Sequence, residues 1–164
     1  MKILIASDLH GDIEYTKALV ELFHGEKFDR LYLLGDLLYD SIHILNPISD
    51  KITAVTGNCD SPSEIEEARF LMPTVNYDYQ FKKVIVMSHG NRVSPYNYEQ
   101  PFDIFFFGHT HCSYLNMDSF GRIIANPGSF ACPRDGIHSF MIMDDEGIKL
   151  IDYNSKAVIT KLNF

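Results

Sequence analysis

The stretch Ile3-Leu4-Ile5-Ala6-Ser7-Asp8-Leu9-His10-Gly11 is a short apolar run that ends in a carboxylate and an imidazole. Four further apolar runs along the chain also end in residue types that bind metals. Runs of this length are typical of buried strands, and side chains just past the carboxyl ends of several strands can converge at one edge of a sheet, where α/β folds bind ligands. The further motifs are Gly35-Asp36, Gly57-Asn58-Cys59-Asp60, Ser88-His89-Gly90 and Gly108-His109-Thr110-His111.

Together the motifs supply seven candidate metal ligands. In an extended segment, residues i and i+2 point the same way, so Asp8-x-His10 and His109-x-His111 would each present two side chains to one point. The carboxylates of Asp8 and Asp36 would repel each other at one sheet edge unless a cation or a proton lies between them. Four imidazoles, two carboxylates and one amide suit two divalent cations that share a bridge. The seven candidates are Asp8, His10, Asp36, Asn58, His89, His109 and His111.

Each motif taken alone has a simpler interpretation. An Asp-Leu-His triplet after a strand is more often a turn with a helix cap, and an Asn that follows Gly is more often a turn former. A lone His89 is more often a satisfied core or surface histidine. Asp60 would orient a nearby imidazole, hold the loop or cap a short turn. The metal interpretation therefore depends on the motifs occurring together.

The first half of the chain alternates between strands and helices. Asp12 is a suitable N-cap for the first helix, and Gly25 is a suitable stop. Pro47 would end the second helix, and the third ends before Pro73. We expect strands at 2–7, 30–34 and 52–56, and helices at 13–24, 41–45 and 63–70.

The second half of the chain is rich in strands. The turns at 118–121 and 144–147 carry hairpin signals. Two mixed sheets packed face to face, with helices outside, would account for both halves, and at 164 residues we expect one domain spanning 1–164. The expected strands are 74–81, 84–88, 104–108, 122–125, 139–143 and 148–153.

Composition narrows the classes of function. The net charge of −8 argues against binding of long nucleic acid, although bound divalent cations would reverse the sign locally and allow an anionic substrate. No apolar stretch is long enough to span a bilayer, and the N-terminus does not resemble a signal peptide. Three cysteines without CxxC spacing suit a reducing compartment, with Cys112 and Cys132 as small buried hydrophobes. We expect a cytoplasmic protein without membrane association.

The motifs in this order resemble the calcineurin-like metallophosphoesterase superfamily. Within it, the segments 57–60 and Asn126-Pro127-Gly128-Ser129 resemble the small YfcE-type phosphodiesterase group. The resemblance implies an α/β fold, a four-layer αββα sandwich of two mixed β-sheets flanked by helices. It also implies a dinuclear centre, with manganese as the expected metal and nickel, zinc or iron as alternatives.

The resemblance further implies which ligands share which cation. One cation would be held by Asp8, His10, Asp36 and His111. The other would be held by Asp36, Asn58, His89 and His109. Asp36 would bridge the two, with one oxygen to each. Two cations about 3.5–4 Å apart clamp a phosphoryl group and lower the pKa of bound water, so we expect hydrolysis of a phosphodiester by attack of metal-bound hydroxide on phosphorus.

One position departs from the wider superfamily, which often carries His after the Gly-Asn pair. Here that residue is Cys59, as in the small phosphodiesterase group. A thiol with a pKa of about 8.5 is able to donate a proton, but a structural cysteine is an equal alternative. We expect substrates with good leaving groups to be favoured. The residues assigned catalytic roles are Asn58, Cys59, Asp60 and His109.

Other functions stay open at this point. A phosphomonoesterase acting on a small nucleotide is a second enzyme hypothesis. A catalytically weak, protein-binding scaffold resembling the retromer subunit Vps29 is a third, although retention of all seven expected ligands favours catalysis. The expected partner is a small phosphodiester or nucleotide-like substrate, and the chain is expected to form a homodimer or homotetramer. Arg92, Tyr96, Arg134 and Asn91 lie near motif ends as candidate pocket residues, although a surface or packing role is the simpler interpretation of each.

Overall fold

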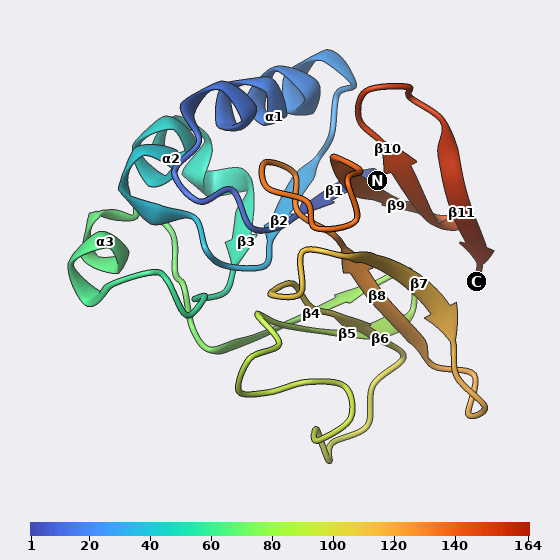
Figure 1. The fold of residues 1–164 in the computed structure, drawn as a ribbon. Helices are drawn as coiled ribbons and strands as arrows, with labels where there is room; N and C mark the ends of the chain where they lie inside the picture. Colours follow the sequence, from blue (N-terminus) through green and yellow to red (C-terminus); the bar gives the residue numbers. More distant parts are fainter.

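Two mixed β-sheets pack face to face in the computed structural model, which describes residues 1–164 (Figure 1). The first sheet has the strand order β11 (Val158–Asn163), β10 (Gly147–Asp152), β9 (Ser139–Asp144), β1 (Ile3–Ala6), β2 (Arg30–Leu33) and β3 (Ile52–Ala54). The second has the order β4 (Val75–Gln80), β5 (Lys83–Ser88), β6 (Ile104–Phe106), β8 (Ile123–Pro127) and β7 (Ser113–Met117). The predicted pair of mixed sheets is confirmed.

The parallel strands bring the candidate ligands to a shared end of the sandwich. β1 pairs in parallel with β2, with Ala6 opposite Leu33, and β2 pairs in parallel with β3. In the second sheet β5 and β6 are parallel, with Met87 opposite Phe106. Their carboxyl ends therefore lead into the loops that carry the motifs.

The side chains of β1 alternate between two layers of the hydrophobic core. Leu4 and Ala6 belong to the apolar cluster that packs under the helices, whereas Ile3 and Ile5 belong to the cluster between the two sheets. All four side chains are fully buried. Because successive side chains on a strand point to opposite faces, one strand serves both layers, which fixes its position and that of the loop after it.

The helices follow local capping signals. α1 (Ile13–Gly25) begins after Asp12, whose carboxylate accepts a hydrogen bond from the backbone N–H of Tyr15 at 2.9 Å. α2 (Leu38–Leu45) begins earlier than predicted and continues into a 3₁₀ helix, η1 (Asn46–Lys51). α3 (Pro62–Glu67) carries a capping box in which the side chains of Ser61 and Glu64 each bond the other residue's backbone N–H. No helix is both long and apolar enough to cross a membrane.

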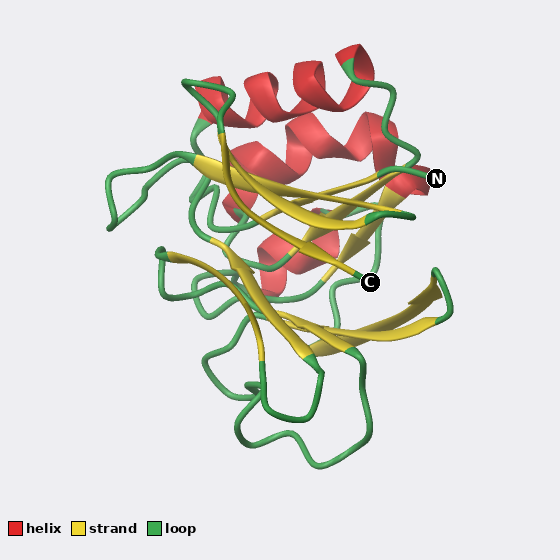
Figure 2. Ribbon diagram, turned by 90° about the vertical axis from the view of Figure 1, so that its right-hand side faces the viewer, coloured by secondary structure: helices red, strands yellow, loops and turns green.

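The two outer faces of the sandwich are covered differently. Figure 2 shows the helices on the outer side of one sheet and loops on the outer side of the other. The prediction of helices on both flanks is corrected here, because the segment 89–103 runs without a helix and covers the second sheet. Phe102 from this segment packs with Val86 and Phe105, so an irregular segment supplies the apolar cover that a helix would give.

Two strands were not predicted. β7 and β11 are the edge strands at one side of the sandwich, and β11 exposes most of its side chains. In β7 the polar residues Ser113 and Asn116 interrupt the apolar ones, so it has no apolar run of the kind that marks a buried strand. The hairpin β7–β8 at the predicted turn 118–121 and the hairpin β9–β10 at 144–147 are confirmed.

Candidate metal centre

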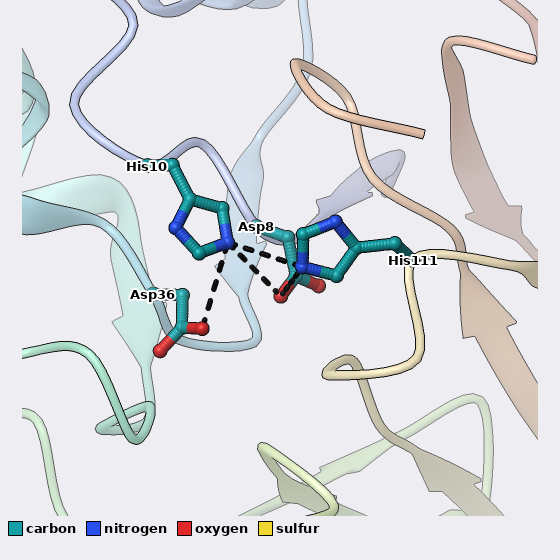
Figure 3. Close-up of side chains that lie close together, drawn as sticks. All are labelled: Asp8, His10, Asp36 and His111. Atoms are coloured by element: carbon teal, nitrogen blue, oxygen red, sulfur yellow. Dashed lines mark hydrogen bonds and ion pairs between the residues drawn. The ribbon is translucent and has the colours of Figure 1, made fainter. Parts of the chain in front are cut away.

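Four of the seven candidate ligands meet at one point. Asp8 and His10 follow β1, Asp36 follows β2 and His111 follows β6, and Figure 3 shows their side chains pointing toward one another. One ligand atom from each residue lies within 4.8 Å of all the others. The side chains of Asp8 and Asp36 are almost fully buried, whereas His10 is partly exposed. Such a convergence of two carboxylates and two imidazoles is a metal-binding arrangement.

The distances show that the four ligand atoms face a common centre. Nε2 of His111 lies 3.2 Å from Oδ1 of Asp8 and 3.1 Å from Nε2 of His10. Nε2 of His10 lies 3.6 Å from Oδ2 of Asp36 and 3.8 Å from Oδ1 of Asp8. One proton would satisfy a single pair of these atoms. A cation would satisfy all four, so the donor set fits a divalent metal.

The hydrogen bonds of Asp8 show whether the donor set fits a cation. Its Oδ2 accepts a hydrogen bond from the backbone N–H of His109 at 3.1 Å. Its Oδ1 is buried and receives no hydrogen bond of suitable geometry, although Nε2 of His111 is close. An unsatisfied buried carboxylate oxygen is costly, and a cation at the common centre would remove that cost.

A second group of candidates also lies near Asp36. Nε2 of His89 is 3.3 Å from Oδ2 of Asp36 and 3.0 Å from Oδ1 of Asn58. The rings of His89 and His109 lie with their centroids 5.1 Å apart. These contacts bring Asn58, His89 and His109 near Asp36, and their binding of a second cation stays a prediction.

The two oxygens of Asp36 have different contacts. Oδ1 of Asp36 accepts a hydrogen bond from the backbone N–H of Cys59 at 2.8 Å. Oδ2 faces both His10, at 3.6 Å, and His89, at 3.3 Å. One oxygen to each cation stays a prediction, because a carboxylate oxygen that accepts one hydrogen bond keeps a second lone pair for a cation.

The Asp-x-His and His-x-His pairs were expected to be extended, and this prediction was wrong. Asp8 and His10 have φ angles of 57° and 49°, and His109 and His111 have 67° and 58°, so neither pair is extended. Asp36 is left-handed as well, with φ of 52°. His111 consequently joins Asp8 and His10 while His109 packs against His89. Non-glycine residues in this region cost free energy, and such strain tends to occur at functional sites.

Backbone carbonyls fix the orientation of two imidazoles. Nδ1 of His89 lies 2.7 Å from the carbonyl oxygen of Leu34, and Nδ1 of His111 lies 2.7 Å from that of Cys132. A carbonyl oxygen only accepts hydrogen bonds, so each Nδ1 carries the proton. Each Nε2 is then left with its lone pair facing an aspartate, as in metal-ligating histidines.

Asp60 holds the loops of the site and does not face an imidazole. Its Oδ2 accepts hydrogen bonds from the backbone N–H groups of Asp36, at 2.9 Å, and Gly57, at 2.8 Å. Its Oδ1 accepts from Leu37, at 2.7 Å, and Leu38, at 3.0 Å. Of the three alternatives for this residue, the geometry supports loop holding. Asp60 is a positioning residue for Asp36 and for the start of α2.

Cys59 lies beside the centre and is exposed. Partial burial and the negative charge of Asp36 raise the pKa of its thiol to about 11. The side chain is therefore protonated near neutral pH. Cys112 and Cys132 are exposed too, so the prediction that they are buried hydrophobes was wrong; both belong to the loops that flank His111, not to strands with an inward face.

Glycine is required at two positions because the backbone there packs directly against other residues of the site and leaves no room for a Cβ. A Cβ at Gly57 would lie 2.1 Å from Oδ1 of Asp36, and one at Gly108 would lie 2.1 Å from Oγ of Ser7 and 2.9 Å from Oδ2 of Asp8. No real Cβ contact is that short, so a larger residue at either position would displace a carboxylate. These glycines let the loops after β3 and β6 pack directly against the candidate ligands.

Two supporting residues escaped the analysis of single motifs. Nδ2 of Asn126 donates to the carbonyl oxygen of Gly108 at 2.8 Å and lies 3.0 Å from Oγ1 of Thr110. Oγ of Ser129 donates to the carbonyl oxygen of Asp8 at 2.7 Å. Both residues are fully buried. The signal was present in the segment 126–129, which the sequence analysis used as a mark of resemblance without assigning it a role.

The protonation states of the centre follow from its contacts. Burial acts to raise the pKa of Asp36, but contacts with His89 and with the backbone N–H of Cys59 outweigh it and lower that pKa to about 2. Burial acts to lower the pKa of His89, yet Asp36 and the Leu34 carbonyl raise it above the ordinary value. The Asp8 carboxylate raises the pKa of His111. In the metal-free protein these imidazoles hold protons more tightly than free histidine does.

Comparison with known proteins defines the class. The family model described as the calcineurin-like phosphoesterase superfamily domain matches residues 1–147, and the chain belongs to this superfamily. Phosphodiesterase YfcE of Escherichia coli (strain K12) is 29% identical over an alignment 183 residues long, which covers 99% of this chain and 97% of the relative.

Solved structures agree with this assignment. The structure described as Yfce, a phosphoesterase from E. coli, matches with a TM-score of 0.92 and 26% identity and covers 99% of both chains. The predicted metallophosphoesterase fold is thereby confirmed. Vps29 from Entamoeba histolytica complexed with Zn²⁺ matches with a TM-score of 0.73 and 19% identity over 99% of both chains. This second likeness concerns the fold alone.

Proposed function

We propose that this protein is a phosphodiesterase that depends on two divalent cations. The observation that carries the proposal is the group of four ligand atoms within 4.8 Å of one another around the unsatisfied Oδ1 of Asp8. The full-length similarity to a phosphodiesterase supports the reaction class. We also propose a cytoplasmic location, which the three free cysteines support.

The ligand sets follow the two groups described above. Asp8, His10, Asp36 and His111 would hold one cation. Asp36, Asn58, His89 and His109 would hold the other, with Asp36 shared. Carboxylate, amide and imidazole ligands suit manganese, with nickel, zinc and iron as alternatives. When bound, the cations would supply Lewis acidity toward the phosphoryl oxygens and lower the pKa of a water molecule that attacks phosphorus.

The chain's own residues have separate tasks in this proposal. Asp36, with a pKa of about 2, stays ionised throughout the neutral range. Asp60 keeps the Asp36 loop in place through backbone hydrogen bonds. Sγ of Cys59 carries a proton in the metal-free protein, and this position lacks the imidazole that would be the stronger general acid near pH 7. Substrates whose leaving groups need little protonation should therefore react fastest.

The other functions have less support. A phosphomonoesterase would use the same centre, so a comparison of ester types is part of the test. A Vps29-like scaffold has no specific observation in its favour, because the likeness to Vps29 concerns the fold alone. A homodimer or homotetramer stays a prediction that size-exclusion chromatography with light scattering would check.

The test is hydrolysis of bis(p-nitrophenyl) phosphate and of p-nitrophenyl phosphate by metal-stripped protein, with manganese, nickel, zinc or magnesium added back. His109→Ala is the test variant, and His43→Ala is its control because His43 is exposed on α2. We expect metal-dependent turnover of the diester, lost in His109→Ala and kept in His43→Ala. Faster turnover of the monoester would favour the phosphomonoesterase. Folded protein without turnover under any metal would refute the proposal.

A further inference from the structure

A polar cavity of about 250 Å³ adjoins the metal centre on the side of Asn58. Nine residues line it, and only one of them is hydrophobic. It is smaller than the 300–1,000 Å³ typical of sites for whole small molecules. Its size and its place beside a candidate ligand suit one arm of a substrate whose phosphorus lies at the centre.

Most polar groups of this cavity are already satisfied inside the protein. Both oxygens of Asp60 accept backbone hydrogen bonds, and the hydroxyl of Thr56 donates to the carbonyl oxygen of Met72. The side chains of Asn91 and Arg92 make no hydrogen bond or ion pair, although both line the cavity. The side-chain groups left to meet a ligand are therefore one guanidinium, one amide and the hydroxyl of Thr74, which also lines the cavity and makes no hydrogen bond.

Arg92 is one of three arginines without an ion pair, with Arg69 and Arg134, and it is the one that lines this cavity. Arg30 and Arg122 each pair with an aspartate, whereas Arg92 is unpaired at the edge of the candidate site. Its backbone is anchored, because Nδ2 of Asn97 donates to its carbonyl oxygen at 3.1 Å and Oγ of Ser88 donates to that of Val93 at 2.7 Å. A fixed backbone with a free guanidinium is suited to recognising an anion.

We propose that the cavity is a subsite for a second anionic group, a phosphate or a carboxylate, on the arm of the diester that extends past Asn58. Arg92 would bind this group with its planar pair of N–H donors, and Asn91 would add an amide donor. The inference rests on the proposed function for the position of the scissile phosphorus.

Binding measurements test the subsite without requiring turnover. We use two pairs of probes, and the two members of each pair differ by one anionic group. Thymidine 3′,5′-bisphosphate against thymidine 5′-monophosphate tests a phosphate, and 3-phosphoglycerate against glycerol 3-phosphate tests a carboxylate. Titration calorimetry would use manganese-loaded protein. We expect at least one doubly anionic probe to bind about tenfold to a hundredfold more tightly than its partner, the range for a hydrogen bond to a charged group.

The variants assign that preference to one residue. Arg92→Ala should abolish it, and Arg92→Lys should keep only part of it because the paired donors are lost. Arg69→Ala is the matched control, since Arg69 is also exposed and unpaired but lines a different cavity. Equal affinities within both probe pairs, or a preference that survives in Arg92→Ala, would overturn the inference.

Turnover then separates this inference from the proposed function. The neutral-arm substrate is the p-nitrophenyl ester of thymidine 5′-phosphate, and the anionic-arm substrate carries an added 3′-phosphate. We expect Arg92→Ala to raise KM for the anionic arm alone. A uniform loss on both substrates and on bis(p-nitrophenyl) phosphate would place Arg92 at the scissile phosphate and overturn the subsite. A binding preference without turnover would keep the subsite and refute the phosphodiesterase.

Discussion

Replacing Asp60 with Asn tests whether this residue positions the metal centre or takes part in chemistry. The carboxylate accepts four backbone hydrogen bonds, two at each oxygen, over distances of 2.7–3.0 Å. An asparagine has one oxygen, so its amide nitrogen would face two N–H donors that have no other partner. Each buried donor left unsatisfied costs about 1–3 kcal/mol, so we expect the free energy of unfolding to fall by about 2–6 kcal/mol.

The substitution should also weaken the centre itself. Leu37 at the N-cap of α2 has no capping side chain, so Asp60 supplies the hydrogen bonds that begin this helix and hold Asp36. Loss of comparable supporting contacts reduces metal affinity or activity by roughly 10–100-fold. Urea unfolding of the metal-free protein, manganese titration and hydrolysis of bis(p-nitrophenyl) phosphate would measure the three effects.

The control is Asp118→Asn, because Asp118 accepts hydrogen bonds from the backbone N–H groups of Phe120 and Arg122 in an exposed turn. Water replaces such contacts, so its effect on stability should be much smaller. If Asp60→Asn keeps both stability and manganese affinity but loses turnover, Asp60 acts in catalysis and the reasoning from its backbone contacts is wrong.

Further predictions concern the glycine contact, the metal and the thiol. Gly57→Ala should reduce manganese affinity at least tenfold by displacing Asp36, whereas Gly25→Ala, in open space and without a positive φ, should leave the affinity measured by titration unchanged. The pKa values of His89 and His111 are raised in the folded metal-free protein. The free energy of unfolding should therefore be greatest below about pH 6.5 and fall as the pH rises through the folded pKa values. Asp36 stays ionised in this pH range and does not contribute to the change. Thermal unfolding between pH 6 and 8 should accordingly show a gain in Tm from manganese that grows with pH, and a constant gain would contradict this. Cys59→Ser should change kcat for bis(p-nitrophenyl) phosphate by less than about threefold if the thiol is a weak general acid, and a large loss would assign it a direct role.

The buried strands and the candidate ligands that follow them were predictable because a single sequence pattern, an apolar run followed by polar residues, indicates both. In β1, β2, β5 and β6 an apolar run fixes the strand in the core, and the first polar residues after it must leave the sheet at a known end. Edge strands lack that constraint. β11 keeps Lys161 and Asn163 exposed on an open edge, so its composition does not differ from that of a loop.

The cover of the second sheet was not predictable for a related reason. Phe102 and Val93 pack on that sheet from a segment without regular hydrogen bonding. Apolar residues that cover a face through irregular backbone follow neither the helical nor the strand period. The resemblance suggested a helical layer, whereas the segment 89–103 contains Pro95 and Pro101, which oppose a continuous helix.

The arrangement of the centre was predictable as a set of residues but not as a geometry. The i, i+2 argument assumed an extended chain, whereas five of the seven candidates have positive φ. Each such residue costs about 1–3 kcal/mol, and contacts between distant loops offset that cost. The backbone N–H of His10 donates to the carbonyl oxygen of Asp36 at 2.9 Å, and that of Gly108 donates to His89 at 2.9 Å.

These contacts explain why the ligand atoms already converge without a cation. The loops after β1 and β2 bond each other, those after β5 and β6 do the same, and Ser129 ties the first pair to the strand-rich second half of the chain. The sandwich therefore holds Asp8 in its strained conformation, and the free energy of cation binding is not needed to order these loops. A preorganised site of this kind can use its binding energy on the phosphoryl group, which is the physical reason that strain is tolerated at these positions.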